Sequence, residues 1–252
     1  MESIHLLFVI ATGLIFGSFI TLASHRLPRA EEIIFQPSHC PACNATLQAR
    51  DLWPVLSWLA ARGRCRHCHA SIHWRYPLIE LCTALLFVMI YWQYGWTEKT
   101  LILSLAAVTL LTMIVVDLEH YIIPDLVHCV LLPLGVWWNI SALTDAAWGL
   151  LLGLALGLAL RYGYRWLRHK DGLGLGDVKF LAVAGVWLGP ELLVPFLFFS
   201  GILGMGTALA WRLLGHGRKF PFGPALAASL FICVAYPAAA QAFWHMQMWV
   251  YR

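Results

Sequence analysis

Long apolar stretches, separated by short polar segments, dominate this chain of 252 residues. An apolar stretch of about 17–25 residues can cross a bilayer as a helix, which closes its backbone hydrogen bonds within the segment. The pattern predicts about eight transmembrane helices, near 4–24, 77–95, 100–117, 124–141, 145–163, 177–189, 191–213 and 223–248. The fold class that follows is an all-α polytopic membrane protein with a short, Gly-rich sixth helix.

The composition supports a membrane location. Hydrophobic residues make up 60% of the chain and charged residues 12%, whereas a soluble domain carries roughly 25% charged residues. The first apolar segment lacks the charge order of a secretory signal, because Glu2 precedes it and Arg26 and Arg29 follow it. We therefore expect this segment, 1–24, to stay in the protein as a membrane anchor.

The positions of the positive charges predict the orientation. Of the 17 Lys and Arg residues, all except Lys99 and Arg252 fall on one side of the membrane in an eight-helix arrangement. Lys and Arg accumulate in cytoplasmic loops, so that side is predicted to be cytoplasmic and both termini to lie opposite. The net charge of +4 then reflects topology and contact with anionic lipid headgroups, and it gives no reason to infer nucleic-acid binding.

This topology places two aspartates at the cytoplasmic boundary. Asp117 ends the third predicted helix and Asp177 begins the sixth. Ionisable residues at membrane depth are costly and usually functional. Two carboxyl groups in a water-poor site share one proton, so one can activate water as a base while the other protonates a leaving amine. The pair is a candidate for the catalytic centre of an aspartic protease.

The segment before Asp177 contains Gly174 and Gly176. Without a Cβ each glycine can adopt a positive φ and let an extended substrate backbone approach the carboxylate. The same segment can instead be a turn followed by a capping aspartate, and Asp117 can be an interfacial residue. The shared membrane face favours the catalytic interpretation. Asp125 follows a proline and better suits the first turn of a helix.

Glu80 is a further carboxylate within an apolar segment. It lies about one turn inside the second predicted helix, beside Leu81 and Cys82. Two roles stay open for it, which are pairing with an arginine of the preceding loop and contact with a substrate.

The loop between the first two helices contains two CxxC pairs. Their four cysteines are Cys40, Cys43, Cys65 and Cys68. Four thiolates at this spacing suit a tetrahedral structural zinc site of the zinc-ribbon type. Disulfides are the competing interpretation, which a reducing cytoplasm disfavours. We expect residues 25–76 to form a small cytoplasmic domain held by the metal, followed by a membrane core at 77–252.

A specific combination of short motifs extends over almost the whole chain. Besides the CxxC pairs they are Gly17-Ser18-Phe19, Arg26-Leu27-Pro28, Pro54-Val55-Leu56-Ser57-Trp58, Arg62-Gly63-Arg64-Cys65-Arg66, Arg75-Tyr76-Pro77 with Glu80, Asp117 with Pro124-Asp125, Gly174-Leu175-Gly176-Asp177-Val178-Lys179, and Pro221-Phe222-Gly223-Pro224. In these motifs the chain resembles the type 4 prepilin peptidases, membrane aspartic proteases that process type IV prepilins and type II secretion pseudopilins.

The resemblance implies that Asp117 and Asp177 are the catalytic pair and that the four loop cysteines hold zinc. It also implies a bacterial inner-membrane enzyme whose substrate has a short basic leader, cut on the cytoplasmic side after a glycine and before a hydrophobic helix. Many members then methylate the new N-terminus with S-adenosylmethionine. The candidate substrate-binding residues are Gly174, Gly176, Glu80 and Lys179.

The chain departs from the family pattern at three positions. Thr21 stands where the family usually has Asn, Leu52 stands where Asn usually follows Asp51, and His73 replaces a frequent Ser. These positions lie in the N-terminal half, where methyl transfer is often placed. They therefore bear on methylation and leave the aspartate pair untouched.

Three other functions are the alternatives. An intramembrane GxGD protease of the signal-peptide-peptidase type usually has Tyr before its first catalytic aspartate, where this chain has Val116, and the CxxC loop also argues against it. A proton-coupled transporter with a zinc-binding loop tends to hold its carboxylates near the bilayer midplane. A zinc-stapled assembly protein without catalysis would not need Asp177. The oligomeric state stays open.

Overall fold

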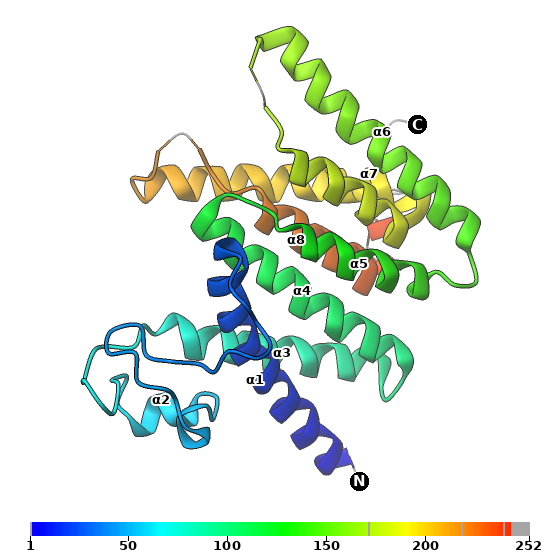
Figure 1. Cartoon of the computed structure of the whole chain (residues 1–252). Coiled ribbons are helices and arrows are strands. Elements are labelled where there is room, and N and C mark those ends of the chain that lie inside the picture. Colours follow the sequence, from blue (N-terminus) through cyan, green and yellow to red (C-terminus); the bar gives the residue numbers. More distant parts are fainter. Residues whose placement is uncertain (1, 171, 218, 239, 243–252) are drawn as a thin grey trace. The chain divides into compact units, whose positions relative to one another are not determined.

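The computed structural model describes residues 2–170, 172–217, 219–238 and 240–242 (Figure 1). The regular elements among them are helices, with two isolated β-bridges and no strand within these ranges. In chain order they are α1 (Glu2–Arg26), η1 (Leu27–Arg29), η2 (Ala49–Asp51), α2 (Leu56–Ala60), α3 (Arg75–Tyr94), α4 (Glu98–His120), α5 (Asp125–Trp138), α6 (Leu143–Arg168), α7 (Leu175–Leu213) and α8 (Gly223–Ala235).

The predicted all-α membrane fold is confirmed. In the described part of the chain, five segments are long and apolar enough to cross a membrane, and they are Ser3–Arg29, Arg75–Tyr94, Glu98–His120, Leu143–Arg168 and Leu175–Leu213. Helices α5 and α8 are apolar but shorter. The number of eight spans therefore stays a prediction.

The sixth and seventh predicted helices, 177–189 and 191–213, correspond to two helical halves of α7 that join at a non-helical residue. At Gly189 the backbone has φ 62° and ψ −176°, and Pro190 follows. Glycine adopts this conformation without the Cβ clash of other residues, so the predicted boundary is a kink. The last predicted helix, 223–248, is interrupted, because α8 ends at Ala235 and the described residues 237–238 and 240–242 are again helical. Its residues 243–248 lie outside the described residues, as does Arg252.

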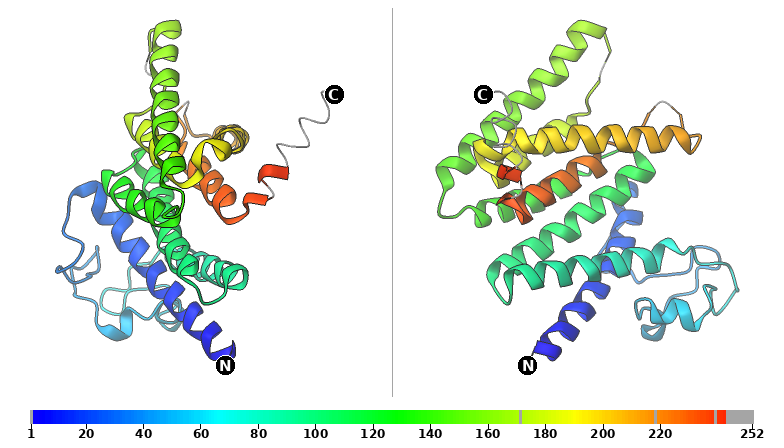
Figure 2. Two further views of the ribbon diagram at one scale, coloured as in Figure 1. Left: turned by 90° about the vertical axis from the view of Figure 1, so that its right-hand side faces the viewer. Right: turned by 180° about the vertical axis from the view of Figure 1, so that it is seen from behind.

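The first compact unit of the chain is Met1–Thr112. In it, α1 packs along α3 (Figure 2). The two backbones approach closely at Gly13, where an added Cβ would lie 2.6 Å from the Cα atom of Ala84. Small residues at such crossings are typical of helix pairs in membranes, where close backbone packing stabilises association.

The second unit is Met113–Arg252. Its central helix is α7, which packs on α5, α6 and α8 (Figure 2). Helix α6 lies very close to α7, because a Cβ on Gly149 or Gly153 would collide with a carbonyl group of α7. Asn139, at the end of α5, donates hydrogen bonds to the carbonyl oxygens of Val186 (2.7 Å) and Trp187 (3.0 Å). The start of α7, which carries Asp177, is thus part of a closely packed helix.

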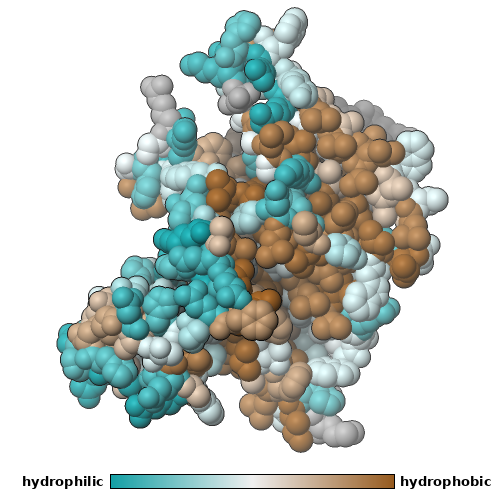
Figure 3. Space-filling view, viewed as in Figure 1, coloured by the Kyte–Doolittle hydropathy of each residue, from teal (hydrophilic) through white to brown (hydrophobic). Residues whose placement is uncertain are grey.

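The helices also present apolar side chains outward. Leu151 on α6, and Met205 and Leu209 on α7, are more than half exposed. In Figure 3, hydrophobic residues cover much of the helical part of the surface, while hydrophilic residues gather over the loop before α3. Large exposed apolar faces on long helices fit contact with lipid tails.

Candidate active site

Asp117 lies in the last turn of α4 and is 5% exposed. Its Oδ2 atom accepts a hydrogen bond of 2.6 Å from the backbone N–H of Gly223. Gly223 is the first residue of α8, and the N–H groups of the first helical turn lack partners within their own helix. The beginning of α8 therefore fixes the position of this buried carboxylate.

Asp177 lies in the first turn of α7 and is half-buried. Its Oδ2 atom accepts a hydrogen bond of 3.1 Å from the backbone N–H of Gly174, the N-cap residue. The carboxylate thus has the capping contact that the sequence offered as the alternative to catalysis. A capping contact and a catalytic role are compatible, since the bond also fixes the carboxylate in place.

Both aspartates lie within the second unit, Asp117 in the last turn of α4 and Asp177 in the first turn of α7. They are close enough for the charge of Asp177 to act on the Asp117 carboxyl group. Each carboxylate is held through Oδ2 by a glycine N–H from a helix start. Two nearby carboxyl groups on a fixed backbone can share a proton and serve as base and acid in hydrolysis.

The expectation about the conformation of Gly174 and Gly176 is wrong. Gly174 has φ −65°, and Gly176 is a helical residue of α7, so neither uses a positive φ. The absent side chains instead allow close packing. A Cβ on Gly174 would lie 3.0 Å from Oδ2 of Asp177, and one on Gly176 would lie 3.1 Å from Cβ of Ile123.

Gly223 is the site residue that sequence reasoning missed. An added Cβ on Gly223 would lie 2.7 Å from Oδ2 of Asp117. The available signal was the segment Pro221-Phe222-Gly223-Pro224, which counted only toward the family resemblance. Its proximity to Asp117 could not be read from the sequence, because 106 positions separate the two residues.

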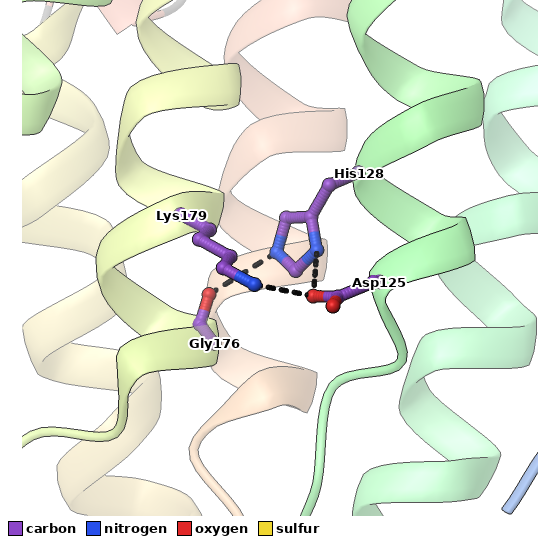
Figure 4. A network of polar contacts seen from close by, with 4 residues as sticks. All are labelled: Asp125, His128, Gly176 and Lys179. Atoms are coloured by element: carbon purple, nitrogen blue, oxygen red, sulfur yellow. Dashed lines mark hydrogen bonds and ion pairs between the residues drawn. The ribbon is translucent and has the colours of Figure 1, made fainter.

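Lys179 lies one turn along α7 from Gly176 and is about half exposed. Its Nζ atom contacts Oδ1 of Asp125 at 2.6 Å (Figure 4). Asp125 is the first residue of α5, as its position after a proline predicted. His128, one turn further along α5, contacts the carbonyl oxygen of Gly176 at 3.1 Å. The two helix starts therefore meet through side chains.

Glu80 lies on α3 and is buried. It accepts a hydrogen bond of 2.6 Å from the backbone N–H of Val55 and also interacts with the Ser18 hydroxyl. Val55 has φ 59°, a conformation that a β-branched residue adopts only under strain. These contacts show Glu80 attaching the loop that carries Val55 to the α1–α3 pair, through main chain and a hydroxyl group. Substrate contact by Glu80 stays a prediction.

The four loop cysteines converge as the CxxC spacing predicted. Their Sγ atoms all lie within 4.8 Å of one another, and Cys40 and Cys68 are 3.9 Å apart. Zinc–sulfur bonds of about 2.3 Å in a tetrahedron place the sulfurs about 3.8 Å apart. The donor set and its spacing thus fit a structural zinc ion.

The two cysteine pairs have the same backbone arrangement. Cys40 N–H donates to the carbonyl oxygen of Ala45 at 2.9 Å, and Cys65 N–H donates to that of Ala70 at 2.8 Å. The residues that follow the second cysteines, Asn44 and His69, both have a positive φ. Each pair is therefore a tight turn that directs two thiol groups to one side.

Backbone donors favour the thiolate form of Cys65, while desolvation and the neighbouring cysteine side chains raise the pKa of Cys43 to about 11. Hydrogen bonds from the backbone N–H groups of Cys68 and His67 lower the pKa of Cys65 to about 6, against desolvation. A thiolate is the form in which cysteine binds a metal. The residues between α1 and α3 thus offer a metal site in a short segment with three small helices.

Comparison with known proteins gave matches over most of the chain. The family model described as the Bacterial Peptidase A24 N-terminal domain matches residues 11–94, and that of the Type IV leader peptidase family matches residues 104–209.

The alignments with relatives that have curated descriptions also cover most of the length of those relatives. A prepilin leader peptidase/N-methyltransferase of Stutzerimonas stutzeri is 34% identical over 85% of this chain and 85% of the relative. A protein of the same description from Neisseria gonorrhoeae is 33% identical over 86% of this chain and 85% of the relative. An Escherichia coli relative, described as "Type 4 prepilin-like proteins leader peptide-processing enzyme", is 36% identical over 86% of this chain and 90% of the relative. No solved structure matches the chain.

Proposed function

The chain belongs to the type IV leader peptidase family, and we propose that it removes the leader peptide from type IV prepilins or type II secretion pseudopilins and then methylates the new N-terminus. The observation that carries this proposal is the placement of Asp117 and Asp177 at helix ends within one unit, each held by a glycine N–H at a helix start. The matched relatives carry both activities in their names.

In the proteolytic step, the ionised member of the aspartate pair takes a proton from a water molecule, whose oxygen attacks the scissile carbonyl carbon. The protonated member gives its proton to the leaving amine nitrogen as the C–N bond breaks. The two groups titrate as a pair, so base and acid are roles of the pair. Gly174, Gly176 and Lys179 line the start of α7 and are the proposed contacts for the substrate backbone near Asp177.

The structure also bears on the rival functions. Asp117 and Asp177 lie in the last turn of α4 and the first turn of α7, whereas coupled transport tends to use interrupted helices near the bilayer midplane. The four-cysteine cluster and Val116 before Asp117 distinguish the chain from proteases of the signal-peptide-peptidase type. A purely structural protein would not need two carboxylates at the ends of membrane helices.

We place the enzyme in the bacterial inner membrane with its basic loops in the cytoplasm. The excess of Lys and Arg in one set of loops supports this orientation, and anionic lipid is then a contact surface for them. Residues 1–24, 25–76 and 77–252 are the proposed anchor, zinc-binding domain and peptidase core. Zinc bound by the four cysteines supplies cross-links that a short segment between two helices otherwise lacks.

For the second activity we propose S-adenosylmethionine as the donor, which supplies an electrophilic methyl group. When bound, it would supply this methyl group to the new N-terminal amine, which would lose a proton. If methylation by this chain differs from that of the family, we expect the cause at the three positions that depart from the family pattern, which are Thr21, Leu52 and His73.

Mass spectrometry of a purified prepilin-like substrate tests both activities. Wild type is expected to release the leader. Only when S-adenosylmethionine is present is the product N-terminus expected to gain one methyl group, a mass increase of about 14 Da. Asp117→Asn and Asp177→Asn are expected to leave the substrate uncut. An uncut substrate with wild type, across several prepilin-like sequences, contradicts the peptidase proposal and turns attention to transport or scaffolding.

A further inference from the structure

We propose that His128 is a positioning residue for Asp177, acting through the peptide group that joins Gly176 to Asp177. The inference rests on the proposed catalytic role of Asp177 and adds a residue to that site. His128 is 8% exposed and lies on α5, whereas Gly176 lies on α7 (Figure 4).

The contact requires a defined form of the imidazole ring. The carbonyl oxygen of Gly176 can only accept, so Nε2 of His128, 3.1 Å away, must carry the hydrogen. The ring is also fixed from the side by Phe180, in an edge-to-face contact with centroids 6.5 Å apart. The imidazole thus contacts α7 on both sides of Asp177 in the sequence.

The position of this hydrogen bond relates it directly to Asp177. The Gly176 carbonyl and the Asp177 nitrogen belong to one planar peptide group. Fixing the carbonyl oxygen therefore fixes the plane from which the Asp177 side chain departs. This restraint adds to the helical hydrogen bonding around the start of α7, where glycine is frequent, at 172, 174 and 176.

A second link joins the same two helical turns. Asp125 and His128 are three residues apart on α5, as Gly176 and Lys179 are on α7, and residues at that spacing share a helix face. Lys179 Nζ contacts Asp125 Oδ1 at 2.6 Å, and this oxygen is 3.9 Å from Nδ1 of His128. The ion pair is exposed and screened by water, so the buried hydrogen bond of His128 carries the restraint.

The Nδ1 atom of His128 supports a functional reason for the residue. It is buried, and it has no hydrogen-bond partner among the described residues. A buried polar atom without a partner is uncommon in a side chain that serves packing alone. The ring is retained here although one nitrogen is unsatisfied, which fits a role that depends on the other nitrogen.

Three substitutions of His128 separate the hydrogen bond from the volume of the side chain. His128→Gln keeps an N–H donor at about the distance of Nε2, His128→Asn places its donor where Nδ1 lies, and His128→Phe keeps a ring without a donor. The matched control is Asn139→Ala, which removes a side-chain bond from α5 to carbonyl oxygens of α7 far along the helix from Asp177.

The measurement is kcat and KM for leader cleavage, with a thermal unfolding curve for each variant of the full chain. His128→Phe and His128→Asn are expected to lower kcat by about 10- to 100-fold with KM changed less than about 2-fold, the effect of a misplaced catalytic group. His128→Gln is expected to stay within about 5-fold of wild type, and Asn139→Ala to lower stability with kcat largely kept.

Two results overturn the positioning role. One is a kcat of His128→Phe and His128→Asn within about 2-fold of wild type. The other is an equal loss of kcat in folded Asn139→Ala, which makes the effect one of general helix packing. Asp177→Asn distinguishes these failures from that of the proposed function. If Asp177→Asn still cleaves, the catalytic assignment itself is wrong; if it is inactive while His128→Phe is normal, only the positioning role is lost.

Discussion

Gly223 gives a sharp test of the active-site geometry, through the substitution Gly223→Ala. The added Cβ would lie 2.7 Å from Oδ2 of Asp117 and 3.0 Å from its Cβ and Cγ atoms. Non-bonded atoms attract best at about 3.5–4.0 Å, so the carboxylate or the start of α8 must move by roughly 0.5–1 Å. The hydrogen bond of 2.6 Å between Gly223 N–H and Asp117 then lengthens.

The expected consequence is larger for catalysis than for folding. A displacement of about 1 Å in a catalytic group can lower the rate by about 100-fold, whereas overpacking of a buried site costs about 1–3 kcal/mol of stability. We expect kcat for leader cleavage to fall by about 10- to 100-fold, measured on the folded fraction of Gly223→Ala. The lost stability is measured separately by thermal unfolding.

Gly201→Ala and Gly206→Ala are the matched controls. Both glycines lie on α7, and an added Cβ at either position meets no atom within 4 Å among the described residues. Alanine raises the intrinsic stability of a helix interior by up to about 1 kcal/mol over glycine, so these variants should cleave at the wild-type rate. A wild-type rate in Gly223→Ala as well would refute the inference that the start of α8 fixes Asp117.

Three further predictions follow from the site and the loop. Asp117→Asn and Asp177→Asn each abolish leader cleavage with little change in folding, as judged by product analysis and thermal unfolding; cleavage by either variant contradicts the assigned pair. Cys43→Ser, or a chelator, lowers the bound zinc and destabilises the residues between α1 and α3, measured by metal analysis and limited proteolysis; full stability without metal shows zinc to be dispensable. Glu80→Leu leaves the Val55 N–H without its acceptor and lowers stability by about 1–3 kcal/mol, while Glu80→Gln keeps an acceptor; equal unfolding temperatures for both contradict this anchoring role.

Short-range patterns in the sequence were enough for the helical membrane fold and the metal site. Long apolar runs predict helices because lipid offers no backbone hydrogen bonds. The CxxC spacing predicts the cysteine cluster because two tight turns bring two thiol pairs together with few degrees of freedom. The boundary between 189 and 191 was also visible as Gly-Pro, although the pattern could not distinguish a kink in α7 from two separate helices.

The pair of aspartates was predicted from topology, because both residues fall at helix ends on one predicted face. What holds each carboxylate depended on the tertiary structure. The Gly223 N–H reaches Asp117 from 106 positions away, and His128 reaches the Gly176 carbonyl from another helix. Such contacts follow from how helices pack, which depends on the close approach of α7 to its neighbours and leaves no local pattern in the sequence.

Gly174 and Gly176 show most clearly what the sequence predicts and what the tertiary structure decides. The sequence indicated that Gly174 and Gly176 matter, and it suggested conformational freedom as the reason. The structure gives a different reason, since both positions have ordinary backbone angles and little space for a Cβ beside Asp177 and Ile123. Residue type and spacing are properties of the chain alone. The space around a residue is a property of the packed helices, so only the tertiary structure could decide why these residues are glycine.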